Sequence, residues 1–159
     1  MKVAYLIRAH HAPSLLERLV RRIAGPEAGV FVHVSRTAED AVYDEMVSRL
    51  QDVDRVAWLP RRTCRYGGFS LVEATLSGID AILAGGERPG HTLLLSGQDY
   101  PLRSRAEIEA TLRDVGWEKV HRQGRRLMPR DLIRQAIAAD LEVGPYLAFA
   151  RARSAGSYE

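Results

Sequence analysis

The sequence predicts an α/β fold in which a mostly parallel sheet is flanked by helices. Short apolar runs, typical of buried strands, alternate with longer segments of helical periodicity. The alternation occurs four times between residues 3 and 115. Glycine and proline follow several of the helical segments, as expected where the chain turns back towards the next strand. This βα order is typical of parallel strands joined by right-handed crossovers.

The strands are predicted at the apolar runs. A continuous apolar run covers residues 3–7, and further strands are predicted at the mostly apolar segments 30–34, 56–58 and 92–95. The run at 92–95 is apolar on both faces, so we expect both faces of that strand to be buried.

Each predicted helix is preceded by a capping pattern, in which Ser or Thr is followed three residues later by Asp or Glu. The patterns are Ser14-x-x-Glu17, Thr37-x-x-Asp40, Ser70-x-x-Glu73 and Ser104-x-x-Glu107. Apolar residues at helical spacing follow each pattern. The helices are expected to end near Ile23, Leu50, Gly85 and Val115.

Composition indicates a globular protein with room for one proper core, since the chain has 159 residues. Cys64 is the only cysteine, which excludes an intrachain disulfide and fits a cytoplasmic location.

The run at 3–7 is too short for a signal peptide or a membrane span, so no transmembrane segment is expected, and peripheral membrane contact stays open. With 23 basic and 20 acidic residues, the net charge of +3 is too small to indicate nucleic-acid binding.

Residues 1–115 and 116–159 are predicted to be separate regions. The second is basic between 119 and 126, and a helix is expected at about 130–142. Its basic segment lacks the interleaved aromatic residues that stack on bases, so a solvated surface is expected and no nucleic-acid partner.

Polar residues follow every predicted strand. They occupy 8–11, 35–36, 61–68 and 96–101. Ligands of open parallel sheets bind beyond the carboxyl ends of the strands, so these segments are expected to form one site. The chain has neither a G-x-G-x-x-G motif nor a P-loop, so phosphate would be bound by side chains and helix N-termini. Arg61, Arg62 and Arg65 could neutralise a diphosphate, and Gly67-Gly68 permits close backbone approach.

Two longer blocks carry a family resemblance. Residues 66–76 read Y-G-G-F-S-L-V-E-A-T-L, and residues 94–102 read L-L-S-G-Q-D-Y-P-L. Together with 3–13 and 31–34, they resemble the core-2/I-branching glycosyltransferases, which include β-1,6-N-acetylglucosaminyltransferases and peptide O-xylosyltransferases. The resemblance covers about residues 1–115, corresponding to the family's N-terminal half.

The resemblance implies a GT-A-like fold, a UDP-sugar donor, a glycan or other hydroxyl acceptor, and transfer with inversion. It also implies a reaction without a metal cofactor. Asp99 lacks the second carboxylate of a D-x-D motif, although Mg²⁺ or Mn²⁺ stays open. The candidate donor-binding residues are His10, Ser35, Arg61, Arg65, Tyr66, Gly67, Gly68, Ser96, Gly97 and Asp99.

The chain also departs from the family pattern. Ser35 stands where the family usually has Asp, and Tyr66 replaces the commoner Trp. The family's catalytic Glu and phosphate-binding basic residues lie in a C-terminal half that cannot be matched to residues 116–159. The catalytic residue is therefore unknown, and the fold is expected to be truncated.

Several residues have two interpretations. Asp99 either lines the site or builds a turn, and His10 and His11 either contact the nucleotide or form a surface loop. Glu73 is better explained by helix capping than by catalysis. Cys64 is expected to be a small buried residue, since no histidine partner is identifiable. No third ligand is spaced to join the two histidines, so no metal site is predicted.

Three hypotheses about function remain at this stage. The chain is a glycosyltransferase, active alone or as a naturally short member. Alternatively, it is a non-catalytic fragment that binds a nucleotide sugar. The third hypothesis is a generic α/β binding module without nucleotide affinity.

Overall fold

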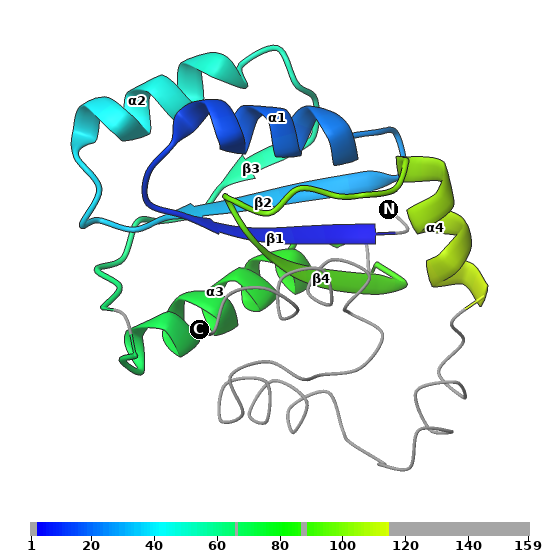
Figure 1. Ribbon diagram of the computed structural model, residues 1–159. Helices are drawn as coiled ribbons and strands as arrows, with labels where there is room; N and C mark the ends of the chain where they lie inside the picture. Colours follow the sequence, from blue (N-terminus) through cyan, green and yellow to red (C-terminus); the bar gives the residue numbers. More distant parts are fainter. Residues whose placement is uncertain (1–2, 66, 87–88, 115–159) are drawn as a thin grey trace, which may run out of the picture. The chain divides into compact units, whose positions relative to one another are not determined.

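The computed structural model describes residues 3–65, 67–86 and 89–114. Within them, strands and helices alternate along the chain (Figure 1). The elements are β1 (Val3–Ala9), α1 (Pro13–Ile23), β2 (Ala28–Val34), α2 (Asp40–Arg49), β3 (Val56–Trp58), α3 (Ser70–Ala84), β4 (His91–Ser96) and α4 (Arg105–Asp114). The chain divides into two compact units, Met1–Pro101 and Leu102–Glu159. Helix α4, which the sequence groups with the first region, falls in the second unit.

The four strands form one parallel sheet in the order β3-β2-β1-β4. β1 lies in the interior, where Tyr5 pairs with Val30 of β2 and Leu93 of β4. This is the order of the first four strands of a doubly wound sheet. The predicted fold class, a Rossmann-like parallel sheet flanked by helices, is therefore confirmed.

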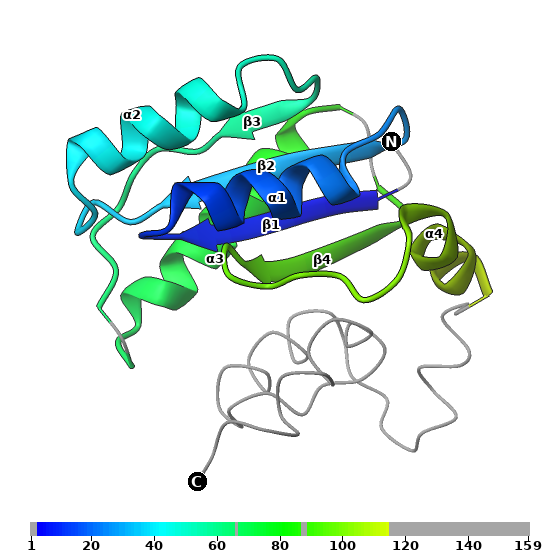
Figure 2. The ribbon, with the colours of Figure 1, turned by 45° about the horizontal axis from the view of Figure 1, so that its top comes forward.

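The helices of the first unit cover both faces of the sheet. α1 and α2 lie on one face and α3 lies on the other (Figure 2). Side chains of β1 alternate between these layers. Leu6 packs on the α3 side with Leu59 and Ile82, whereas Tyr5 and Ile7 point to the opposite side and are fully buried.

Burial of β4 differs from the prediction on one face. Leu93 and Leu95 are buried, but Leu94 is 40% exposed. Leu94 pairs with Leu6 and so faces the α3 layer. The reason is that α3 packs on β1 and β2, which leaves this face of β4 less covered.

Three of the four predicted capping boxes are wrong. α1, α2 and α3 begin after Ala12, Glu39 and Phe69, and none of these ends has a side-chain cap hydrogen bond. The Ser70 hydroxyl instead accepts a hydrogen bond from the Arg65 amide (2.9 Å), outside the helix. The remaining box is confirmed, because the Ser104 amide and hydroxyl donate to Glu107 Oε2 at 2.8 and 2.6 Å.

Strand β1 is longer than predicted and includes Arg8 and Ala9. Both residues pair with β2, which extends to Val34. The helix expected at about 130–142 lies outside the described residues. Among those residues, no helix has the length and apolar character needed to cross a membrane.

Candidate functional site

The strand order creates a switch point between β1 and β4. From β1 the chain crosses to β2 on one side, and from β3 it returns to β4 on the other side of β1. α1, which follows β1, lies on one face of the sheet, and α3, which precedes β4, lies on the other face (Figure 1). The loops after β1 and β4 begin at neighbouring carboxyl ends of the sheet. Ligands of such sheets bind in the crevice outside these carboxyl ends.

A tight turn follows β4. The Asp99 amide donates to the Ser96 carbonyl (2.9 Å), and Asp99 Oδ2 accepts from the Ser96 amide (2.7 Å). The Ser96 hydroxyl accepts from the Gln98 amide (3.3 Å). The turn-building interpretation of Asp99 is confirmed, while a ligand contact of Asp99 stays a prediction.

Gly97 fastens this turn to β1. Its amide donates to the Arg8 carbonyl (2.8 Å). A Cβ at this position would lie 2.9 Å from the Ala9 Cβ. Glycine therefore allows the backbones of the two loops to approach at the switch point.

The loop after β1 carries the two histidines. The His10 and His11 rings lie 4.1 Å apart between centroids, and His11 Nε2 lies 2.5 Å from Gln98 Nε2. Burial, with a smaller effect from His11, lowers the pKa of His10, which favours the neutral ring. His10 is nonetheless exposed, so it is accessible to a ligand at this edge. Ala12 closes the loop with φ of 57°, a left-handed conformation that alanine rarely adopts.

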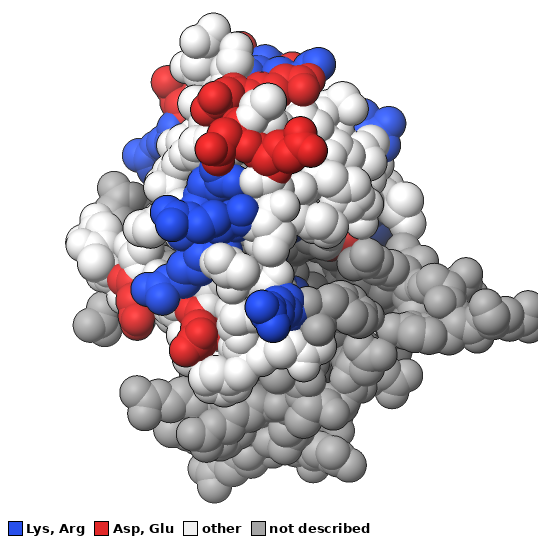
Figure 3. All heavy atoms as spheres, turned by 90° about the vertical axis from the view of Figure 1, so that its left-hand side faces the viewer, with Lys and Arg blue, Asp and Glu red and all other residues white. Residues whose placement is uncertain are grey.

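A basic hollow of about 510 Å³ lies at the same edge, beyond β2 and β3. It is lined by Arg36, Pro60, Arg61, Arg62, Thr63, Ser70 and Glu73. Figure 3 views this side, where basic side chains gather below a group of acidic ones. Such a surface attracts anions to the edge.

Arg61 is engaged by α2 and the segment before it. Nη1 donates to Asp40 Oδ1 and Nη2 to the Ala38 carbonyl, each at 2.6 Å. The guanidinium also lies over the Tyr43 ring, 4.8 Å from its centroid. Its side chain is only 13% exposed. The predicted phosphate ligand is thus an anchor for α2 in this structure.

Ser35 is buried and its hydroxyl is occupied by protein groups. It lies 2.8 Å from the Thr37 hydroxyl and accepts from the Cys64 amide at 3.2 Å. The hydroxyl therefore joins the loops after β2 and β3. Cys64 is half-buried, and this burial raises the pKa of its thiol.

The glycine-containing turn before α3 carries further predicted residues. The Gly68 amide donates to the Arg65 carbonyl (3.0 Å), and Gly67 has φ of 72°, which favours glycine. Arg65 is exposed at this turn. Tyr66 lies outside the described residues.

Glu73 corrects the capping interpretation. Ser70 is inside α3 and no side chain caps this helix, so Glu73 is not part of a capping box. Its side chain is exposed and lines the basic hollow. The sequence analysis missed this location of Glu73, because the pattern S-x-x-E is also typical of a helix cap.

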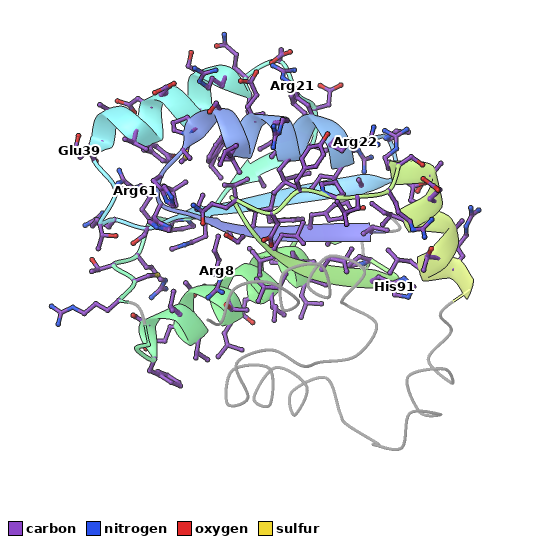
Figure 4. All side chains as sticks on the ribbon, in the orientation of Figure 1. Arg8, Arg21, Arg22, Glu39, Arg61 and His91 are labelled. Carbon is purple, nitrogen blue, oxygen red and sulfur yellow. The ribbon has the colours of Figure 1, made fainter. Side chains whose placement is uncertain are left out.

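Arg8 belongs to the segment 8–11 that was expected at the site, but it was not among the candidate donor-binding residues. The sequence placed it in the loop after the first strand, whereas the structure places it inside β1. Figure 4 shows it at the carboxyl end of β1, on the side of the sheet that faces α3. Burial lowers the pKa of Arg8, and the neighbouring Cys64 and Asp99 oppose this effect. Side chains alternate between the two faces of a strand, so Arg8 could have been placed on the same face as Leu6 if the end of β1 had been known.

The predicted residues fall into three groups, apart from Tyr66. Ser96, Gly97 and Asp99 form the turn at the switch point, beside the loop that carries His10. Ser35 and Arg61 hold the neighbouring loops together, and Arg65, Gly67 and Gly68 lie at the turn before α3. The described part of the chain contains no group of three His, Cys, Asp or Glu residues that could hold a metal ion. A second, smaller hollow of about 270 Å³ lies at the amino ends of β2 and β3, beside Gly29, Arg55 and Gly85.

The chain belongs to the core-2/I-branching enzyme family, whose sequence model matches residues 3–125. It is 27% identical over 112 residues to the human β-1,3-galactosyl-O-glycosyl-glycoprotein β-1,6-N-acetylglucosaminyltransferase, covering 70% of this chain and 26% of that protein. It is 30% identical over 108 residues to the human N-acetyllactosaminide β-1,6-N-acetylglucosaminyl-transferase, covering 67% of this chain and 27% of that protein. The chain therefore spans about a quarter of the length of these relatives.

Among solved structures, S. aureus TarS (residues 1–349) is similar with a TM-score of 0.48 and 11% identity. The match covers 72% of this chain and 33% of TarS.

Proposed function

We propose that this chain is the donor-binding part of a glycosyltransferase that uses a UDP-sugar, with N-acetylglucosamine as the first candidate sugar. Membership of the core-2/I-branching family and the names of both human relatives support this class of reaction. Xylose remains the second candidate sugar, from the family resemblance. The acceptor would be a glycan or another hydroxyl compound, and transfer would invert the anomeric carbon.

The observation that carries the proposal is the meeting of two loops at the switch point. Residues 8–11 and 96–99 are joined by the Gly97–Arg8 hydrogen bond (2.8 Å) and the His11–Gln98 contact (2.5 Å). They lie at the edge where sheets of this order bind nucleotides. Arg36 and Arg62, which line the hollow beyond β2 and β3, add positive charge to the same edge of the sheet.

The chemistry follows from this placement. The diphosphate leaves as the acceptor oxygen attacks, so negative charge develops on the leaving group. Arginines fixed at the sheet edge would stabilise that charge without reorganisation. Holding the donor against a fixed edge would also orient its anomeric carbon. The carboxylate that accepts the acceptor's proton stays unassigned. Independence from metal ions and a cytoplasmic location remain predictions.

The first test is calorimetric titration of the full chain with UDP, UDP-N-acetylglucosamine and UDP-xylose. We expect saturable binding of UDP and tighter binding of the sugar that is the true donor. ADP and GDP are matched controls with the same diphosphate and different bases, and should bind more weakly. Equal binding of all three diphosphates would indicate a non-specific anion site and contradict the proposal.

The second test separates transfer from binding. The chain is incubated with labelled UDP-N-acetylglucosamine and a galactosyl acceptor, and the products are separated by mass. Transfer or hydrolysis would establish an enzyme, whereas binding without turnover would establish a donor-binding module. Absence of both binding and turnover would leave the generic α/β module.

A further inference from the structure

Arg8 occupies the central position of the carboxyl edge. The register aligns it with His33 of β2 on one side and Ser96 of β4 on the other. Aligned residues of a parallel sheet point to the same face, so these three polar side chains form a row on the α3 side. The row ends at the switch point, where Gly97 bonds the Arg8 carbonyl.

The guanidinium of Arg8 is incompletely satisfied. Its Nε is buried and has no hydrogen-bond partner. Within the described residues no ion pair joins it to a carboxylate. A buried donor without an acceptor has a high desolvation cost, which an anionic ligand could offset.

The groups around Arg8 neutralise it only in part. His33 is held as an acceptor, because the Arg62 amide donates to its Nε2 (3.2 Å). Burial, followed by the charges of Arg8, Arg62 and Arg61, lowers the pKa of His33, which favours its neutral ring. Burial raises the pKa of the Cys64 thiol, which favours its neutral form. Asp99 is the remaining countercharge, and its Oδ2 already accepts from the Ser96 amide.

We propose that the Arg8 guanidinium binds the diphosphate of the nucleotide at the switch point between β1 and β4. This inference rests on the proposed function and names the side chain that recognises the anion. It assigns phosphate recognition to a residue of strand β1. The Arg61 Nε is also buried without a partner, but the other two guanidinium nitrogens of Arg61 are held by Asp40 and the Ala38 carbonyl.

The test compares Arg8→Gln and Arg8→Lys with the wild-type chain in titrations with UDP, inorganic pyrophosphate and uridine. Gln removes the charge, and Lys restores it without the planar fork. We expect Arg8→Gln to weaken binding of UDP and pyrophosphate by about tenfold or more, with uridine unchanged. Arg8→Lys should recover part of the loss. Arg22→Gln, on the exposed end of α1, is the matched control and should bind all three as the wild type does.

The outcomes separate this inference from the proposed function. If the wild type binds UDP and Arg8→Gln binds it equally well, Arg8 has no such role and the donor-binding proposal stands. If the wild type binds neither UDP nor pyrophosphate, both proposals fail. Thermal melting monitors folding of the variants. If Arg8→Gln does not fold, Arg8→Lys decides: unchanged pyrophosphate affinity overturns the inference, and a selective loss for UDP and pyrophosphate over uridine supports it.

Discussion

At the scale of single residues, Arg61 shows that an arginine at the ligand-binding edge can be bound by protein groups instead of a ligand. Its guanidinium reaches Asp40 and the Ala38 carbonyl and covers the Tyr43 ring. Asp40 is 90% exposed, so the ion pair itself contributes little. The bond to the Ala38 carbonyl and the ring contact fix the start of α2.

Arg61→Ala is therefore expected to destabilise the fold by about 1–3 kcal/mol, because a half-buried carbonyl loses its charged donor. Urea unfolding followed by circular dichroism measures the difference. Arg62→Ala is the matched control from the next position and makes none of these contacts. Equal stability of the two variants would show that the Arg61 contacts do not hold α2.

His33 makes stability depend on pH. Burial and three neighbouring arginines lower its pKa in the folded state below the ordinary value of 6.5. Below that pH the unfolded chain binds a proton that the folded chain resists, so folding weakens as pH falls. The window opens near the unfolded-state pKa and extends down to the folded one.

His33→Gln should flatten this dependence, since Gln is an acceptor of similar reach that does not titrate. Urea unfolding at pH 7, 6 and 5 measures the slope for wild type and variant. His10→Gln is the comparison, because that ring is exposed and its removal should change the slope less. A wild-type slope in the His33→Gln variant would contradict the assignment.

At the scale of elements, the contact between α3 and β1 depends on Gly78. A Cβ there would lie 2.4 Å from Leu6 Cδ1 and 2.8 Å from Leu6 Cδ2. Leu6 is buried in the core between the sheet and α3. The glycine thus allows the helix to approach the strand.

Gly78→Ala is expected to destabilise the protein by about 1–3 kcal/mol through overpacking. Helix propensity alone predicts the opposite sign, a gain of about 1 kcal/mol. Chemical denaturation decides between the signs, with Ser77→Ala as the neighbouring control. A more stable Gly78→Ala variant would mean that α3 has room to move away from Leu6.

The sequence predicted the type and approximate position of each helix and strand, but predicted their ends less well. Apolar runs and helical spacing located all strands and helices of the described region, because burial dictates both periods. The capping pattern failed three times, because Ser70 bonds the Arg65 amide and the other two helices begin without side-chain caps. A local pattern cannot indicate which donor a hydroxyl will meet.

At the scale of the whole molecule, the sheet order places four predicted residues at one switch point. The general rule for parallel sheets made that edge predictable. The role of Arg8 was not, since it depends on the strand extending two residues further and on the burial of one nitrogen. The capture of Arg61 by Asp40 joins residues 21 positions apart, which sequence spacing does not reveal.

The most direct test of the switch-point site is a ¹⁵N-resolved NMR titration of the full chain with UDP. We expect saturable shifts of the amides at 8–11 and 96–99 that follow one binding curve. The amides around the opposite hollow, at Gly29, Arg55 and Gly85, should not move. Shifts centred on that opposite hollow, or no saturable shifts at all, would contradict a nucleotide site between β1 and β4.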